Sequence, residues 1–230
     1  MLLLKPEDFF DLRDFEHAGI FEGLEYVWQV LARIGDYIKA NLRPALVGKL
    51  MPFAYADDKV FIGEGTVVEP GACILGPALI GRNCRIRSGA YLRENCLIGD
   101  RALVGHATEV KNSILLNGAK APHFNYVGDS VLGAGANLGA GTKLSNVKVT
   151  GETITVRVGN TAYDTGLRKF GAIVGDGVET GCNSTLNPGT LVGKGAVIYA
   201  NASVRGYIPP GTIVKLRQVI ESAPIAEQKP

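Results

Sequence analysis

Three histidines are the side chains best suited to acid–base chemistry in this sequence, because imidazole titrates near neutral pH without large perturbation. His123 lies in the segment Pro-His-Phe-Asn-Tyr-Val-Gly-Asp, beside Asn125 and Tyr126, and is the natural candidate for a general base. A histidine that only makes structural hydrogen bonds is the alternative. His106 lies seventeen residues from His123, but His17 is remote and a zinc site needs a third ligand. We therefore expect no metal site.

Arg87, Arg93 and Lys111 form a second candidate group. They occupy a position of the repeat described below that usually holds glycine or another small residue. Such a cluster could bind an anion such as a sugar phosphate, because charge-assisted hydrogen bonds to phosphate are strong. A solvated charged face is the alternative interpretation.

A six-residue repeat determines the elements that must position these side chains. The fourth position is often Gly or Asn, which tolerate the positive φ of a corner, and the fifth is usually small. Neither a helix nor an alternating strand has a period of six. An aliphatic residue recurs at every sixth position, with Thr180 as the exception, in the runs Ile62 to Leu116, Leu132 to Leu144 and Val174 to Val204.

This period predicts an all-β fold, a left-handed parallel β-helix of hexapeptide repeats. Cys84 and Cys96 fall at small inward positions, so we expect them to be packing residues. The β-helix is expected over residues 51–214, and 215–230 form a C-terminal tail. Residues 1–50 are expected to form a helical cap, with an amphipathic helix at about 20–41 covering the open end of the first coil.

Two interruptions break the repeat, and loops that interrupt a solenoid often carry function. Residues 122–131 number ten where six would keep register, so about four are expected to loop out. Residues 147–172 contain two short alternating segments, Thr153 to Val158 and Thr161 to Tyr163, joined by Gly159-Asn160. This second interruption is predicted to be a β-hairpin.

The composition narrows the class of protein. Lys and Arg number 24 against 22 Asp and Glu, without a long basic patch, so nucleic acid is not an expected partner. No run resembles a signal peptide or a membrane span. The four cysteines, one of which is Cys182, lack C-x-x-C spacing. We expect a cytoplasmic protein with reduced thiols and no membrane association.

Three linked segments carry a family resemblance: EVKNSILLNGAKAPHFNYVGDSVLGAGANLGAGT, GLRKFGAIVGDGVETGC and NPGTLVGKGAVIYANASVRG. Together they resemble the C-terminal acetyltransferase domain of the bifunctional N-acetylglucosamine-1-phosphate uridylyltransferase/glucosamine-1-phosphate acetyltransferase. The resemblance is greatest to the sugar-nucleotidyltransferase-related branch that carries P-H-x-N-Y-V-G-D and L-R-K-F-G. It covers roughly residues 60–206.

The resemblance implies acetyl transfer from acetyl-CoA to the amine of an amino-sugar phosphate such as glucosamine 1-phosphate. It also implies a homotrimer with active sites between neighbouring prisms, and neither a metal nor an acyl-enzyme. The implied catalytic residues are His123 as base, Glu109 assisting it, and the backbone amide near Ala140 facing the thioester oxygen. The remaining roles are sugar and phosphate binding by Lys111, Tyr126, Asn137, Lys169 and either Arg87 or Arg93, and acetyl-CoA contact by Asn146, Cys182 and Ala200.

The sequence departs from the family in two respects. We expect no uridylyltransferase domain and therefore no UTP-dependent chemistry, and a separate nucleotidyltransferase becomes a candidate partner. Cys182 stands where the family usually has serine. Two alternatives stay open: an acyltransferase with another sugar acceptor, and a non-catalytic trimeric module that binds or regulates.

Overall fold

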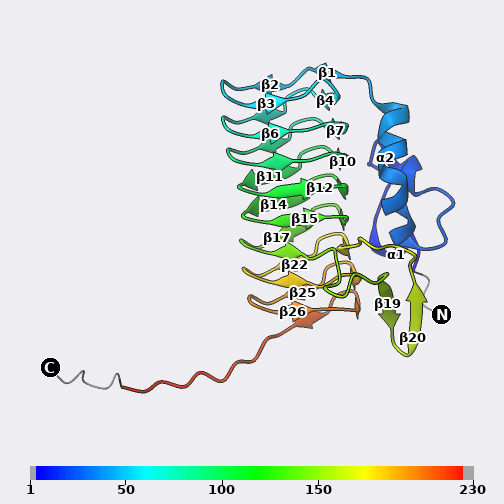
Figure 1. Cartoon of the computed structure of the whole chain (residues 1–230), viewed down its shortest axis with the longest axis vertical. Helices are drawn as coiled ribbons and strands as arrows, with labels where there is room; N and C mark the ends of the chain where they lie inside the picture. The colour runs from blue at the N-terminus through cyan, green and yellow to red at the C-terminus, as the bar shows by residue number, and fades with distance from the viewer. Residues whose placement is uncertain (1–3, 225–230) are drawn as a thin grey trace.

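The computed structural model describes residues 4–224 and is built on a three-sided prism of short parallel strands (Figure 1). Each coil of the chain adds one strand to each of three parallel sheets, which we name A, B and C. Within these residues a strand pairs with the strands one coil above and one coil below it, so the ladders run along the prism. The predicted left-handed parallel β-helix is confirmed.

The strands of the described residues are short. Sheet A contains β1 (Ala45–Leu46), β4 (Val60–Ile62), β7 (Ala78–Ile80), β10 (Cys96–Ile98), β13 (Ser113–Leu115), β16 (Val131–Leu132), β21 (Ala172–Val174), β24 (Thr190–Val192) and β27 (Tyr207–Ile208). Sheet B contains β2 (Lys49–Leu50), β5 (Val67–Val68), β8 (Arg85–Ile86), β11 (Leu103–His106), β14 (Lys120–His123), β17 (Asn137–Leu138), β22 (Glu179–Thr180), β25 (Val197–Ile198) and β28 (Ile213–Val214). Sheet C contains β3 (Tyr55–Ala56), β6 (Cys73–Ile74), β9 (Tyr91–Leu92), β12 (Glu109–Lys111), β15 (Tyr126–Gly128), β18 (Lys143–Leu144), β23 (Thr185–Leu186) and β26 (Ser203–Val204).

The interior of the prism is filled by stacked aliphatic side chains with small residues beside them. Ile86 and Leu92 are completely buried there. Cys84 and Cys96 are buried in the same cluster, as predicted for packing residues, and burial raises the pKa of both thiols. Asn83, at φ 56°, is one of the corner residues in the left-handed region that the repeat predicted.

The register shortens by one residue in the middle of the prism. Ile62 pairs with Ile80 and Ile80 with Ile98, eighteen residues apart each time. Ile98 then pairs with Leu115, and Leu115 with Leu132, which are seventeen residues apart. The six-residue repeat predicted an inward side chain at Leu116. In the structure Leu115 points into the prism and Leu116 packs in the outer cluster.

The expected loop at 122–131 is wrong for the same reason. Ala121 and Val127 both fill interior positions, six residues apart, and Leu132 follows after five. Strands β14 and β15 thus continue the coil, and no four-residue excursion is needed. Two adjacent leucines, Leu115 and Leu116, concealed the slip because either one satisfies an aliphatic repeat.

The outer face of sheet A is apolar and is covered by the N-terminal segment. This segment contains α1 (Pro6–Phe9), two 3₁₀ turns (η1, Ala18–Phe21, and η2, Val27–Gln29) and α2 (Val30–Asn41). In α2, Ile34 and Ile38 are fully buried in one cluster with Leu97 and Ile114 of the sheet. The expectation of a cap is therefore wrong, because α2 lies along the side of the prism and not over its end (Figure 1).

The predicted helix at 20–41 is also too long. Its apolar spacing spans η1, η2 and α2, and Gly23, at φ +68°, separates the first two. The solenoid begins before residue 51, because β1 pairs with β4 and β2 pairs with β5. It ends at Val214 in β28, and residues 215–224 are exposed and irregular. Residues 1–3 and the rest of the expected tail, 225–230, lie outside the described residues.

The predicted hairpin is confirmed. Strands β19 (Thr155–Val158) and β20 (Thr161–Asp164) pair antiparallel, and the hairpin stands beside the lower coils below the N-terminal segment (Figure 1). Ile154 and Val156 are fully buried with Phe170 in the outer apolar cluster of sheet A. Within the described part of the chain, no helix has the length and apolar character that crossing a membrane requires.

Candidate active site

Four residues that the sequence analysis selected lie at one edge of the prism. We call this edge the B–C corner, because the chain passes there from sheet B to sheet C. Backbone hydrogen bonds link successive coils along it: the N–H of Gly141 donates to His123 O (2.9 Å), that of Asn183 to Ala140 O (2.8 Å), and that of Asn201 to Cys182 O (2.9 Å). His123, Ala140, Cys182 and Ala200 therefore occupy equivalent positions of four consecutive coils, which span roughly 14 Å at about 4.8 Å a strand.

The chain around His123 is held by one buried amide. The side chain of Asn125, which is 3% exposed, accepts a hydrogen bond from the His123 N–H (3.0 Å) and donates to Gly139 O (2.8 Å). Phe124 between them has φ 52°, a left-handed conformation that is energetically unfavourable for a residue other than glycine. The imidazole of His123 is exposed at this corner and makes no hydrogen bond within residues 4–224.

His106 occupies the same position one coil before His123, and the two are register partners in β11 and β14. Its Nδ1 lies 2.6 Å from Ser88 O, so this nitrogen carries the proton and donates it to the carbonyl. Its ring meets the Phe124 ring edge-on, with centroids 5.3 Å apart. The structure thus brings together two of the three histidines, and His17 lies elsewhere, beside Tyr37 in the N-terminal segment.

The same corner presents backbone donors. The carbonyls of His123, Ala140 and Cys182 accept the coil-to-coil bonds described above. Among the described residues, no hydrogen bond uses the N–H of Ala140, Cys182 or Ala200. These three groups form a column of free donors that begins one coil beyond His123, and such donors can stabilise a developing negative charge without reorganisation.

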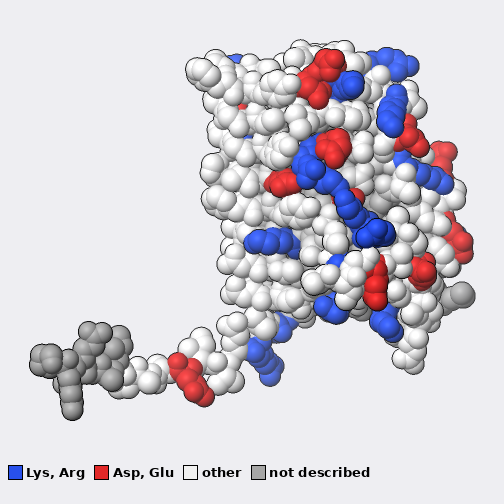
Figure 2. Space-filling view, in the orientation of Figure 1, with Lys and Arg blue, Asp and Glu red and all other residues white. Residues whose placement is uncertain are grey.

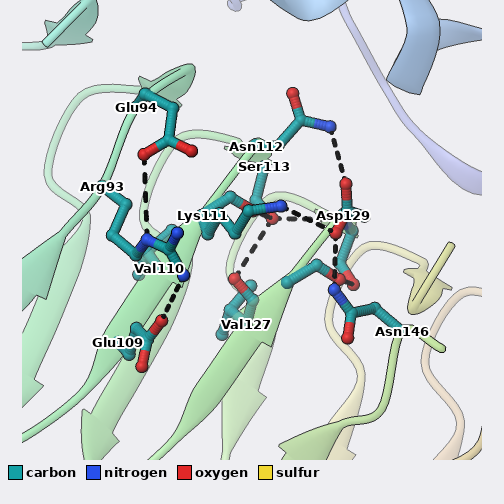
Figure 3. Close-up of polar contacts among 12 residues, drawn as sticks. Arg93, Glu94, Glu109, Val110, Lys111, Asn112, Ser113, Val127, Asp129 and Asn146 are labelled. Atoms are coloured by element: carbon teal, nitrogen blue, oxygen red, sulfur yellow. Dashed lines mark hydrogen bonds and ion pairs between the residues drawn. The ribbon is translucent and has the colours of Figure 1, made fainter. Parts of the chain in front are cut away.

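The outer face of sheet C carries the charged part of the site (Figure 3). Arg93 Nη1 donates to Glu109 Oε1 at 3.2 Å, and Arg93 Nε lies 3.7 Å from Glu94 Oε2. These ion pairs raise the pKa of Arg93, which stays charged. Glu109 is thus bound to Arg93, and no hydrogen bond within residues 4–224 joins its carboxylate to His123.

Asp129 is the centre of the remaining contacts on this face (Figure 3). Its carboxylate accepts hydrogen bonds from Asn112 Nδ2 (2.9 Å) and Asn146 Nδ2 (2.5 Å), and Lys111 Nζ lies 3.5 Å away. The side chains of Lys111 and Asp129 are only 13% and 6% exposed. Because a charge-assisted N–H···O bond is normally about 2.7–2.9 Å, the contact between Lys111 and Asp129 is longer than an optimal one.

Tyr126 and Asn146 meet above a glycine. The phenol oxygen of Tyr126 lies 3.5 Å from Asn146 Oδ1, and a Cβ at Gly128 would come within 2.7 Å of that phenol and 2.8 Å of the Asn146 amide. The absence of a side chain at Gly128 therefore makes room for both groups. Burial raises the pKa of Tyr126, so its hydroxyl is a neutral donor at physiological pH.

Three selected residues do not join this face within one chain. Arg87 follows β8 in sheet B, and Asn137 in β17 of sheet B donates to Glu179 (2.8 Å). Lys169 is exposed after the hairpin, next to Phe170, whose N–H donates to Asn146 O (2.9 Å). Of the two candidate arginines, Arg93 therefore shares a face with Lys111, and Arg87 lies on another face.

Sequence reasoning missed two polar residues that organise the site. Asp129, one residue beyond the Tyr-Val-Gly segment, and Asn125 stand out in the sequence only as parts of a motif. The sequence feature that could have identified them is a polar residue at a coil corner between residues that are buried. Sequence alone does not show which donors converge on it, because Lys111, Asn112 and Asn146 come from other coils.

The remaining polar groups bear on redox and metal chemistry. Cys182 is exposed, whereas Cys84 and Cys96 are buried and Cys73 is intermediate. Within the described residues, no group of three or more His, Cys, Asp or Glu side chains could hold a metal ion.

On the face shown in Figure 2, acidic and basic side chains lie intermixed over the middle coils.

Comparisons with known proteins agree on one family. The model of the GMPPB C-terminal domain matches residues 74–163. The bifunctional protein GlmU of Methanococcus vannielii is 34% identical over 193 residues, covering 84% of this chain and 46% of that protein. A bifunctional sugar-1-phosphate nucleotidylyltransferase/acetyltransferase of Sulfurisphaera tokodaii is 37% identical over 158 residues, covering 69% and 39%.

The chain thus spans less than half the length of these two relatives. Among solved structures, an Arabidopsis UDP-N-acetylglucosamine acyltransferase matches at 15% identity and a TM-score of 0.40, covering 74% of this chain and 70% of its own. That likeness is too low to bear on function. The sequence relatives, the family model and the β-helix support the predicted resemblance to a GlmU-type C-terminal acetyltransferase domain of the hexapeptide-repeat class.

Proposed function

We propose that this protein transfers an acetyl group from acetyl-CoA to the amine of an amino-sugar phosphate, with glucosamine 1-phosphate as the first acceptor to test. The observation that carries the proposal is the B–C corner. An exposed imidazole, His123, stands there directly before a column of free backbone donors, and the charged face of sheet C begins beside it. Acetyl transfer to an amine needs a base and an oxyanion donor, and this corner offers both.

The chemistry assigns one step to each group. The amine nitrogen attacks the thioester carbon while His123 takes the proton that the nitrogen loses. The Ala140 N–H donates to the carbonyl oxygen as it becomes negative. The carbon–sulfur bond then breaks, and the proton passes from His123 to the departing CoA sulfur. This scheme needs no covalent acyl-enzyme.

The acceptor phosphate is assigned to Lys111 and Arg93, and the sugar hydroxyls to Tyr126. Asn146, which the resemblance implies as an acetyl-CoA contact, lies beside Tyr126, and we assign it to the sugar instead. Lys111 keeps donors free at its 3.5 Å separation from Asp129, and a phosphate fits those donors. Holding the phosphate fixes the distance between the amine and His123, which is the positioning part of catalysis. Acetyl-CoA is assigned to the B–C corner beside Cys182 and Ala200, whose N–H groups are free.

A homotrimer would complete this site. The N-terminal segment and the hairpin cover sheet A, whereas sheets B and C keep exposed aromatic side chains along their shared corner, including Tyr91 (37%), Phe124 (57%) and Tyr199 (46%). Packing sheet B of one chain against sheet C of the next would bury these rings. It would also bring Asn137 and Arg87 of one chain toward Lys111 of its neighbour.

The test is the release of CoA from acetyl-CoA with glucosamine 1-phosphate as acceptor, corrected for the protein's own thiols. His123→Ala should lower kcat by about 10²–10⁴, the usual contribution of a general base. His106→Ala is the matched control, because it removes the same ring from the same corner one coil away. It should retain most turnover.

Each other outcome has a distinct meaning. Loss of turnover in His106→Ala with retention in His123→Ala would reassign the base. Saturable acetyl-CoA binding without release would keep the acyltransferase class but change the acceptor. No acetyl-CoA binding by a folded oligomer would replace the proposal with a non-catalytic binding module.

A further inference from the structure

A cleft of about 700 Å³ lies between the hairpin and the lower coils, outside the site described above. One wall is the β19 strand and the segment 145–150, and the other is formed by the corners where the chain leaves β23 and β26. Its volume is in the range of small-molecule sites. The lining residues are Ser145, Val147, Lys148, Val149, Thr150, Thr155, Arg157, Asn187, Pro188, Gly189, Arg205 and Gly206.

The charge of this cleft has one sign. Lys148, Arg157 and Arg205 line it, and none of its lining residues in the described part of the chain is Asp or Glu. Within residues 4–224, neither Arg157 nor Arg205 forms an ion pair or a side-chain hydrogen bond, and Lys148 Nζ donates only to Thr153 O (2.7 Å). Lys and Arg side chains gather along the lower edge of the prism in Figure 2. Three cations with free donors around one hollow are suited to a multiply charged anion.

The cleft also has apolar walls. Val149 is fully exposed, Val147 is 44% exposed, and Pro188 lies opposite them in the lining. The exposed valine side chains in this loop are unfavourably hydrated. A flat apolar group that packed on them would remove this apolar surface from water. Apolar walls combined with a few convergent polar groups are the usual composition of a small-molecule site, and a bare inorganic anion has no use for them.

We propose that this cleft binds a nucleoside diphosphate. The base lies on Val147, Val149 and Pro188, and the diphosphate accepts hydrogen bonds from Lys148, Arg157 and Arg205. The proposal goes beyond the acetyl transfer argued above, because that scheme uses the B–C corner and the Lys111 face. Two natural ligands share this chemistry: the ADP end of a coenzyme A thioester and the nucleotide of a nucleotide sugar.

The experiment is isothermal titration calorimetry of the full chain with ADP, UDP, adenosine 3′,5′-bisphosphate, CoA and inorganic pyrophosphate. We expect ADP or UDP to bind and the double variant Arg157→Gln/Arg205→Gln to weaken that binding at least about tenfold. Arg101→Gln, which removes an exposed arginine far along the prism, is the matched control and should bind as the wild type does. Because CoA is also expected at the B–C corner, tighter binding of CoA and the bisphosphate would identify the coenzyme end only where Arg157→Gln/Arg205→Gln weakens it and Arg101→Gln does not. Tighter binding of UDP with the same dependence on the two arginines would identify the nucleotide sugar.

A second variant tests the apolar wall. Val149→Ser should weaken ADP or UDP severalfold and leave pyrophosphate unchanged, and its full exposure means that no core packing is lost. The proposal is overturned if neither ADP nor UDP binds, if Arg157→Gln/Arg205→Gln binds them as well as Arg101→Gln does, or if pyrophosphate binds as tightly as both nucleotides. These titrations require no turnover, so they are independent of the acetyltransferase assay.

Discussion

Asp129→Asn is the perturbation that most directly tests how the charged face is held together. The wild-type carboxylate receives three donors on two oxygens: Asn112 on Oδ1, and Asn146 with Lys111 on Oδ2. An amide keeps only one oxygen and presents an N–H₂ group in place of the other. At least one donor would therefore face another donor, and the Lys111 ammonium would lose its counter-charge.

The magnitude follows from burial. A buried donor left without an acceptor costs about 1–3 kcal/mol, and breaking a well-buried ion pair costs about 3–5 kcal/mol. Since the Lys111–Asp129 separation of 3.5 Å is loose, we take the lower part of that range and expect about 3 kcal/mol of lost unfolding free energy. For a chain of this size, that corresponds to a Tm lower by about 6–12 °C.

The assay is urea and thermal unfolding at one fixed protein concentration, because an oligomer's stability depends on concentration. Asp58→Asn, at an exposed carboxylate, is the control and should change the unfolding free energy by less than about 0.5 kcal/mol. The double variant Lys111→Met/Asp129→Asn should lose less unfolding free energy than the two single variants lose together, because it leaves no unpaired charge. An Asp129→Asn protein within about 1 kcal/mol of the wild type, or strict additivity in the cycle, would refute the reasoning.

Three further results are expected. Cys182 should be the one thiol that reacts rapidly with a disulfide reagent, bound acetyl-CoA should slow that reaction, and Cys182→Ser should abolish it. Asn125→Ala should lower kcat at nearly constant acetyl-CoA affinity, because it removes the hydrogen bonds that fix the backbone at His123. Equal losses of kcat and of acetyl-CoA affinity would contradict this. Burial lowers the pKa of His17 from 6.5, so the unfolded chain binds more protons just below that pH, and stability should fall as pH drops through 6.5. His17→Gln should flatten this part of the urea-midpoint profile.

The period of six was sufficient to predict the fold because it is a local property. An aliphatic side chain at every sixth residue meets its equivalents in the coils above and below, whatever the rest of the chain does. The same locality explains the main errors in the predicted fold. The slip at Leu115 and Leu116 is invisible in a pattern of residue types, and the apolar stripe of 20–41 does not say which surface it covers.

The candidate site divides in the same way. His123 could be selected from its residue type and motif, and the structure places it in one column with Ala140, Cys182 and Ala200. Asp129 could not be selected, because its donors lie one coil before it (Lys111 and Asn112) and one coil after it (Asn146), and their convergence depends on the shortened register.

Sequence by itself determined the β-helix, the hairpin and the chemical types available at each corner, since these depend on neighbours along the chain. Tertiary structure alone decided that α2 covers the flank of sheet A, that Arg93 and not Arg87 shares a face with Lys111, and that the hairpin encloses a basic cleft. The physical reason is that in a coil repeat the spacing along the chain determines which residues lie at equivalent positions. The contacts of side chains on the outside of the prism depend on the segments that pack against them, which can come from anywhere in the chain.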